Sequence, residues 1–153
     1  NLKLESENLM DLPEIEGDSD ALRKVFHHVI VNAIKFTPDG GSVTISGVPV
    51  SPGQLGMPEG GVEIIVADTG IGIDHEYLDL IFTKFYQTGE LALHSSGKTK
   101  FKGAGPGLGL AISRGIIDAH RGKLWAASTG YDESSCPGSQ FHIILPLRFR
   151  QIP

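Results

Sequence analysis

The sequence has little cysteine, no long apolar run and no excess of positive charge. Its single cysteine, Cys136, excludes an internal disulfide and a thiol-rich metal site, which suits a reducing compartment. No stretch approaches the roughly 18 apolar residues of a membrane span, and the N-terminus shows no signal-peptide pattern. The chain begins at Asn1 without an initiator methionine, so we expect a fragment of a longer protein.

Charge and length narrow the function classes further. The net charge is -5, and the 13 Lys and Arg are scattered apart from Lys98, Lys100 and Lys102, so no nucleic-acid surface is indicated. With 153 residues, of which 40% are hydrophobic, the chain is long enough for one domain with its own core.

A glycine-rich junction stands out at residues 101–112, FKGAGPGLGLAI, where a lysine-bearing loop runs into a helix-patterned segment. Free N–H groups at a helix start attract an anion, and glycine lets a ligand come close to the backbone. On glycine content alone, a flexible surface loop is the favoured interpretation.

Two known phosphate loops do not fit this junction. A dinucleotide-binding loop needs a strand before its glycines, whereas residues 88–102 are polar and show no alternation. The Gly97-Lys98-Thr99 run resembles the end of a P-loop, but Ala92 stands where that motif needs glycine.

Residues 18–36 predict an amphipathic helix. Asp18 supplies a cap, and Pro38 and Gly40 follow its end. The apolar residues recur at helical spacing: Leu22, Val25, Phe26, Val29, Ala33 and Phe36. His28, Asn32 and Lys35 share one stripe beside this apolar face. The stripe is either a solvated flank of the helix or part of a binding site. In the second case Asn32 would supply an oxygen ligand and Lys35 a cation for a metal-bound phosphate.

The remaining pattern predicts an α+β sandwich, a mixed sheet with helices on one face. An edge strand is predicted near the N-terminus, around Leu2 and Leu4. Further strands are predicted at 42–48, 62–67, 123–128 and 140–145, with a short helix from Asp74. A longer helix is predicted at 108–119, and its helically spaced residues are Leu108, Ile112, Gly115, Ile116 and Ala119. The Asp68-Thr69-Gly70 run is either ordinary turn chemistry or an acceptor for the amine of a base.

In this order, the segments resemble the ATP-binding catalytic domain of sensor histidine kinases, in the GHKL superfamily shared with gyrase B, Hsp90 and MutL. Residues 28–38 resemble its N box, 68–73 its first glycine box, 81–87 its F box and 105–110 its second glycine box. Further resemblance at 119–122 and 138–146 extends the match over nearly the whole chain.

The resemblance implies the Bergerat fold for residues 1–153. This fold is a two-layer sandwich with a mostly antiparallel sheet of about five strands, three helices on one face and a mobile ATP lid at about 87–106. It also implies a separate dimerisation domain that carries the phosphoacceptor histidine, because none of the six histidines has the expected context. We expect that domain to precede Asn1. We expect this fragment to be a cytoplasmic monomer without direct membrane contact, while the full-length protein can carry a membrane anchor.

Carried over residue by residue, the resemblance implies that Asn32 ligates Mg²⁺ on the phosphates of ATP, that Lys35 contacts those phosphates, and that Asp68 reads adenine. Gly70 and Gly72 would let the base approach, and Ser139 would support Asp68 through water. Lys98, Lys100 and Lys102 either reach the phosphates or form a solvated charge run, and Phe82 with Phe85 would anchor the base of the lid. The other implied nucleotide contacts are Gln87, Gly105, Gly107, Leu108 and Gly109.

Three departures from the family pattern bear on function. Pro106 replaces a small hydroxyl residue, and Arg121 replaces a glycine. His28 stands where the hydrolysing relatives carry the glutamate that activates water. A histidine can act as a base, but the missing carboxylate favours transfer of the phosphoryl group to a histidine of a protein over hydrolysis. The resemblance also implies a response regulator as the downstream partner. The alternatives are an ATP hydrolase or clamp, and a docking module that binds nucleotide without catalysis.

Overall fold

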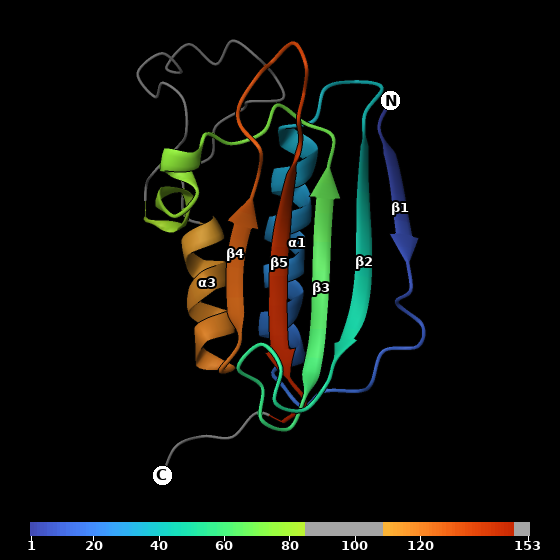
Figure 1. The fold of residues 1–153 in the computed structure, drawn as a ribbon, viewed down its shortest axis with the longest axis vertical. Helices are drawn as coiled ribbons and strands as arrows, with labels where there is room; N and C mark the ends of the chain where they lie inside the picture. The colour runs from blue at the N-terminus through green and yellow to red at the C-terminus, as the bar shows by residue number, and fades with distance from the viewer. Residues whose placement is uncertain (85–108, 149–153) are drawn as a thin grey trace.

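The structure is a computed structural model that describes residues 1–84 and 109–148. Its core element is a five-stranded sheet in the order β1-β2-β3-β5-β4 (Figure 1). The strands are β1 (Lys3–Glu7), β2 (Ser42–Val50), β3 (Gly61–Asp68), β4 (Lys123–Ala127) and β5 (Ser139–Pro146). Only β1 and β2 pair in parallel, and the other three pairings are antiparallel. The predicted strands, and the mixed and mostly antiparallel sheet, are confirmed.

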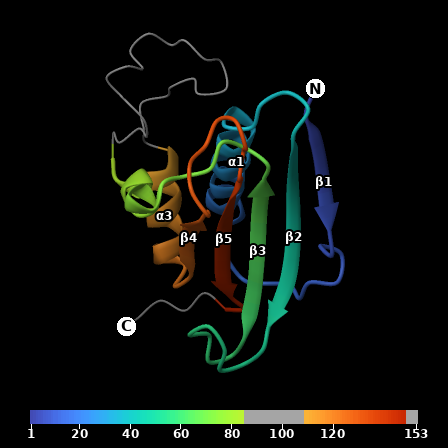
Figure 2. The ribbon, with the colours of Figure 1, turned by 45° about the horizontal axis from the view of Figure 1, so that its top comes forward.

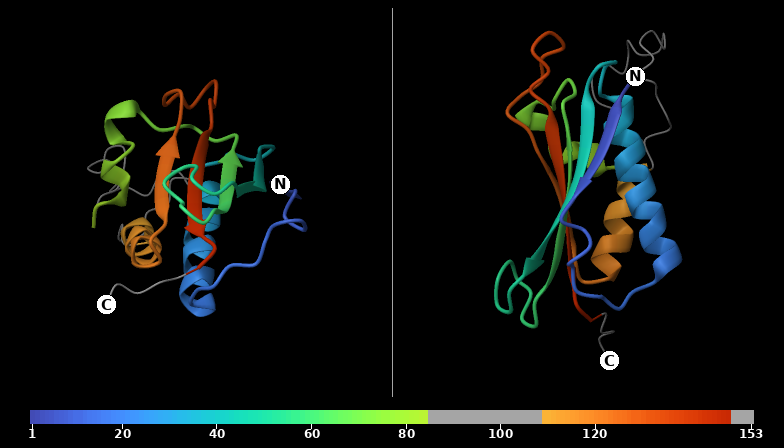
Figure 3. Two further views of the ribbon diagram at one scale, coloured as in Figure 1. Left: turned by 60° about the horizontal axis from the view of Figure 1, so that its bottom comes forward. Right: turned by 90° about the vertical axis from the view of Figure 1, so that its right-hand side faces the viewer.

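Two α-helices, α1 (Ser19–Lys35) and α3 (Gly109–Ala119), pack side by side on one face of the sheet (Figure 3). The predicted helix after Asp74 forms instead as two 3₁₀ turns, η1 (His75–Tyr77) and η2 (Leu80–Phe82). Within the described ranges, no helix covers the opposite face of the sheet. The two-layer α+β sandwich is therefore the observed fold.

Helix α1 begins and ends where its sequence predicts. The side chain of Asp18 accepts hydrogen bonds from the backbone N–H groups of Asp20 and Ala21, both at 3.1 Å. These bonds satisfy donors that the first turn otherwise leaves unpaired. Four of the predicted apolar positions are buried against the sheet: Leu22, Val25, Val29 and Ala33.

Helix α3 buries only part of the predicted stripe: Ile116 packs against the core, as predicted, but Ile112 does not lie on the buried side. Ile112 is 45% exposed, whereas Ser113 and Ile117 are fully buried. The segment is apolar on more than one side, so its periodicity alone does not select the inner face. Packing against α1 selects it, and the small side chain of Ser113 lies on the buried side.

Arg121 closes α3 in a conformation that suits glycine. Its φ is 66°, and the N–H groups of Arg121 and Gly122 bond to the carbonyls of Asp118 and Ile117, both at 2.9 Å. These two bonds define a Schellman motif with Arg121 at the left-handed position. The replacement of the usual glycine by arginine therefore strains the backbone but leaves the turn intact.

We expect Arg121→Gly to stabilise the domain. A left-handed conformation costs a residue with a Cβ atom about 1–2 kcal/mol. Glycine also gives the unfolded chain more conformational freedom, which offsets part of this effect. The net increase in the free energy of unfolding should be about 0.5–1 kcal/mol. Thermal unfolding should show a midpoint about 2–3 °C higher. Arg121→Ala, which removes the same side chain but keeps Cβ, is the control; an equal gain in both variants would contradict the backbone explanation.

Candidate functional site

The candidate site lies at the end of the sheet where β3 finishes and β5 begins. Asp68, the last residue of β3, pairs in register with Ser139, the first residue of β5. The C-terminal end of α1 lies near the end of β3 (Figure 2). The two segments are joined there, because the N–H of Ile71 donates to the carbonyl of Phe36 at 3.0 Å. The sheet thus brings together the segments that contain Asn32, Asp68 and Ser139.

The carboxylate of Asp68 is buried and held by three donors. Its Oδ1 accepts from the N–H groups of Gly70 at 2.8 Å and Ser139 at 3.2 Å, and its Oδ2 accepts from Ser139 Oγ at 2.8 Å. Ser139 therefore contacts Asp68 directly, and the expected bridging through water is wrong. A carboxylate offers about four acceptor positions, so the donors within residues 1–84 and 109–148 leave one position on Oδ2 unused.

Burial raises the pKa of Asp68, because desolvation disfavours the charged form; the hydrogen bonds from Ser139 and Gly70 oppose this rise but do not cancel it. When the pKa of an acid is higher in the folded state than in the unfolded chain, folding is favoured most at pH values below the unfolded-state pKa. This contribution to stability is lost as pH rises through the folded-state pKa. At neutral pH, the ionised carboxylate therefore costs folding energy, which is the pattern of a group kept for binding.

We accordingly expect Asp68→Asn to be at least as stable as the wild type at pH 7 without nucleotide. The stability advantage of the variant should shrink as pH falls, because the folded wild-type carboxyl becomes neutral below its raised pKa. Little advantage should remain near 3.8, the ordinary pKa of the group, where the unfolded chain also takes up the proton. Thermal midpoints of both proteins between pH 7 and pH 4 would measure this. A variant that is less stable at pH 7 and gains at low pH would contradict the sign.

Glycine at positions 70 and 72 is required by the protein's own backbone. A Cβ at Gly70 would overlap the carbonyl of Phe36, and a Cβ at Gly72, whose φ is 79°, would overlap the carbonyl of Gly130. Close packing of this loop explains both residues without a ligand. The approach of a base to them stays a prediction.

On α1, Asn32 and Lys35 are half-buried in the last turns of the helix, as predicted. One turn earlier, His28 lies against α3, because a Cβ at Gly109 would stand 2.9 Å from His28 Nδ1. Desolvation lowers the pKa of His28, and the nearby charges of His27, Lys24 and Lys35 lower it further. The start of α3 therefore packs beside the stripe that holds His28, Asn32 and Lys35, which brings residues of the N box and the second glycine box together.

Several predicted contacts lie outside the described residues. These are Phe85, Gln87, Gly105, Gly107 and Leu108, together with the lysines at 98, 100 and 102, Pro106 and the predicted lid at about 87–106.

Sequence reasoning missed one support of the site, the loop after β4. Ser128 Oγ accepts from the N–H of Ile73 at 3.0 Å and donates to the carbonyl of Gly138 at 2.7 Å. A Cβ at Gly138 would overlap the backbone carbonyl of Asp68, so the end of this loop packs tightly against the end of β3. The sequence signals here are the turn pair Pro137-Gly138 and the family resemblance that begins at Gly138, and neither reveals that Ser128 holds the loop.

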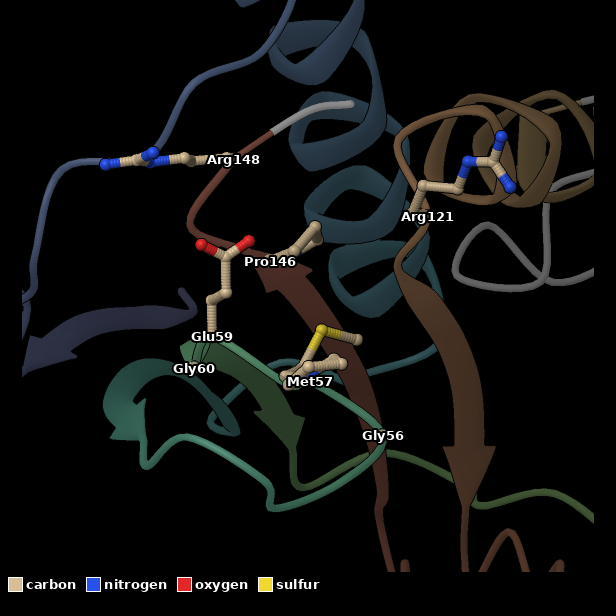
Figure 4. Close-up of a pocket in the computed structure, with 8 residues that line it drawn as sticks. Gly56, Met57, Glu59, Gly60, Arg121, Pro146 and Arg148 are labelled. Atoms are coloured by element: carbon tan, nitrogen blue, oxygen red, sulfur yellow. The ribbon is translucent and has the colours of Figure 1, made fainter. Parts of the chain in front are cut away.

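A pocket of about 160 Å³ lies at the opposite end of the sheet, around Met57, Glu59 and Pro146 (Figure 4). Arg121 and Arg148 flank it from opposite sides, with their guanidinium groups directed away from it. It contains none of the candidate site residues.

Neither a metal cage nor a membrane helix is found in the described part of the chain. No three His, Cys, Asp or Glu side chains in residues 1–84 and 109–148 come together to hold a metal. In the same ranges, no helix is both long and apolar enough to cross a bilayer.

The model of the family described as histidine kinase-, DNA gyrase B- and HSP90-like ATPase matches residues 17–149. The chain belongs to this ATPase family. It is 35% identical over 147 residues to the adaptive-response sensory kinase SasA of Gloeothece citriformis, covering 96% of this chain and 32% of that protein. The methyl sulfide methyltransferase-associated sensor of Methanosarcina acetivorans is 31% identical, over 95% of this chain and 12% of that protein. The chain thus spans at most about a third of these curated relatives.

Solved structures place it among the sensor histidine kinase members of the ATPase family. The mycobacterial sensor histidine kinase MprB matches with a TM-score of 0.72 and 26% identity, over 97% of this chain and 84% of that one. Full-length ShkA, solved in complex with AMPPNP, matches with a TM-score of 0.72 and 26% identity, over 99% of this chain and 27% of that one. The described fold is therefore that of a histidine kinase ATP-binding domain.

Proposed function

We propose that residues 1–153 bind ATP with Mg²⁺ and donate the γ-phosphate to a histidine on a separate dimerisation domain of the same protein. The chain would be the catalytic domain of a two-component sensor kinase, with its lid at about 87–106. The observation that carries this proposal is Asp68, a buried carboxylate on which the described residues leave one acceptor position unused, in a site bordered by the N box and the first glycine box.

Asp68 suits adenine because the exocyclic amine of that base is a hydrogen-bond donor. Gly70 and Ser139 fix the carboxylate in place, so little orientational freedom is lost on binding. Its burial excludes competing water and strengthens the contact. The same acceptor would face the carbonyl of guanine, which gives the site a reason to reject GTP.

Asn32 and Lys35 would act on the phosphates. A single amide oxygen is too few ligands to hold Mg²⁺ alone, which fits an ion carried by the phosphates of ATP. When bound, Mg²⁺ would neutralise phosphate charge during transfer. Asn32 would orient the phosphate group from α1, and the ammonium of Lys35 would attract it. Positioning and charge neutralisation supply most of the catalysis in phosphoryl transfer.

His28 favours transfer over hydrolysis. It occupies the position of the hydrolysing relatives' glutamate, and its ring packs beside Gly109 at the start of α3. An imidazole in contact with a neighbouring helix has less freedom to orient a water molecule than a solvated carboxylate has. We infer that the isolated chain releases phosphate slowly.

A response regulator is proposed as the downstream partner. A kinase of this fold, ThkA, has been solved in complex with the response regulator protein TrrA; it is 23% identical to this chain with a TM-score of 0.68. For the present chain, such a partner follows only from its family membership.

The test is to mix the chain, γ-labelled ATP and a separately produced dimerisation domain. We expect label on a histidine of that domain, acid-labile and base-stable, and none on the chain alone. Label on the chain itself would contradict the missing phosphoacceptor. Steady release of free phosphate without label on the added domain would favour the hydrolase, and tight ATP binding with neither product would favour the docking module.

A further inference from the structure

Arg114 joins helix α3 to the next strand, β4, and to η2, which lies about 30 residues earlier in the sequence. It lies on α3, and its Nη2 and Nε donate to the carbonyl of Leu124 on β4 at 3.0 and 3.3 Å. Its guanidinium carbon lies 4.2 Å from the centre of the Phe82 ring in η2. Nη2 also lies 4.0 Å from Asp79 Oδ1, but Asp79 is almost fully exposed, so this ion pair contributes little.

The ring that Arg114 covers is itself fixed in the core. Phe82 is 5% exposed and meets the ring of Phe141 edge-on, with centroids 6.2 Å apart. Phe141 is fully buried on β5, two residues after Ser139, which holds Asp68. A continuous series of contacts therefore runs from α3 through Arg114 and Phe82 to the strand that supports the base-reading carboxylate.

Arg114 also lies close in sequence to where α3 meets the N box. Gly109, five residues earlier on the same helix, packs against His28, one turn from Asn32. A shift of α3 along or away from η2 would move Gly109 against the stripe that holds Asn32 and Lys35. A helix has no internal hinge over so short a distance, so the anchor at Arg114 fixes the place of its first turn.

We propose that Arg114 is a positioning residue for nucleotide binding and phosphotransfer, which sets α3 against η2 and β4 and thereby aligns the start of α3 with the phosphate-contacting stripe of α1. This inference rests on the proposed function. The guanidinium suits the role because it is planar, stacks on Phe82 and presents two donors to one carbonyl. A lysine would keep the charge but lose the fork and the flat stacking surface.

The experiment compares Arg114→Met, Arg114→Lys and the exposed control Arg23→Met with the wild type, at a temperature at which circular dichroism shows each of them folded. For Arg114→Met, we expect kcat/KM for transfer from ATP to the added dimerisation domain to fall about tenfold, since small displacements of positioned groups have large rate effects. Arg114→Lys should recover part of this loss, and Arg23→Met should match the wild type.

A double-mutant cycle with Phe82→Leu separates positioning from stability. If Arg114 acts through Phe82, the double variant should lose no more kcat/KM than the worse single variant, which corresponds to strong coupling between two side chains in contact. A purely structural Arg114 would lower the thermal midpoint and leave kcat/KM of the folded protein unchanged, and that result would overturn the inference, as would equal activity of the lysine and methionine variants.

Failure of the proposed function gives a different pattern. If the wild type transfers no phosphate, the proposed phosphotransfer function is refuted. The role of Arg114 in positioning is then tested by the affinity for ATP alone, measured by calorimetry. A several-fold loss of affinity in Arg114→Met, absent in Arg23→Met, supports positioning, and unchanged affinity overturns it. Should Arg114→Met not fold, Arg114→Lys and Phe82→Leu are subject to the same criteria.

Discussion

Replacing Asp68 by asparagine is expected to lower the affinity for ATP about 100-fold while the domain stays folded, since a buried polar pair that becomes mismatched costs several kcal/mol. The asparagine oxygen can still accept from the N–H groups of Gly70 and Ser139. Its amide nitrogen would take the place of Oδ2, where the hydroxyl of Ser139 can turn from donor to acceptor. The same nitrogen would then present a donor to the amine of adenine. Calorimetric titration of Mg-ATP into both proteins measures the loss.

Ser139→Ala is the matched control for this change. It removes one donor from Oδ2 but keeps the carboxylate as an acceptor. We expect it to lower stability by about 1–2 kcal/mol and ATP affinity by less than about tenfold. Asp68→Asn with unchanged ATP affinity would refute the assignment of Asp68 as the base-reading group. Equal losses in both variants would instead point to general loosening of this end of the sheet.

The second large effect is expected for Asn32→Ala. Removing the amide should lower the rate of phosphotransfer about 1,000-fold, a loss typical when one preorganised group that stabilises the transition state is deleted. ATP affinity should fall by no more than about tenfold, because the adenine contact at Asp68 is untouched. Rapid-quench measurement of transfer from saturating ATP separates this rate from binding.

Asn32→Asp completes the comparison, because it keeps an oxygen ligand of the same length. It should retain more activity than Asn32→Ala if the oxygen of residue 32 is what acts on the metal-bound phosphate. Near-normal transfer by Asn32→Ala would remove residue 32 from the site, and an equal loss in both variants would assign the effect to helix packing.

The parts of the fold that could be predicted depend on local chemistry. Asp18 as a cap, Pro38 and Gly40 after the end of α1, and the β-branched run of β3 act within a few residues, so the sequence displays them directly. The resemblance also implied that Ser139 supports Asp68, and the two residues do pair at one end of the sheet. The roles of Asn32, Lys35 and Asp68 stay predictions until nucleotide binding is measured.

What could not be predicted depends on contacts between distant segments. The inner face of α3 was predicted only in part: Ile116 packs against the core, but the choice between Ile112 and Ser113 is made by packing against α1 and not by the helix itself. The direct bond from Ser139 to Asp68 needs the register of β3 and β5. Arg114 carried no motif, and only the placement of Phe82 and Leu124 around it reveals what it joins.

The most direct test of the central claim is calorimetric titration of Mg-ATP and Mg-GTP into the wild-type chain. A buried acceptor at Asp68 predicts that ATP binds and that GTP binds at least about 100-fold more weakly, because guanine would place a carbonyl against the carboxylate. Equal affinities for the two nucleotides would contradict base reading by Asp68, and binding of neither would contradict a functional nucleotide site in this chain.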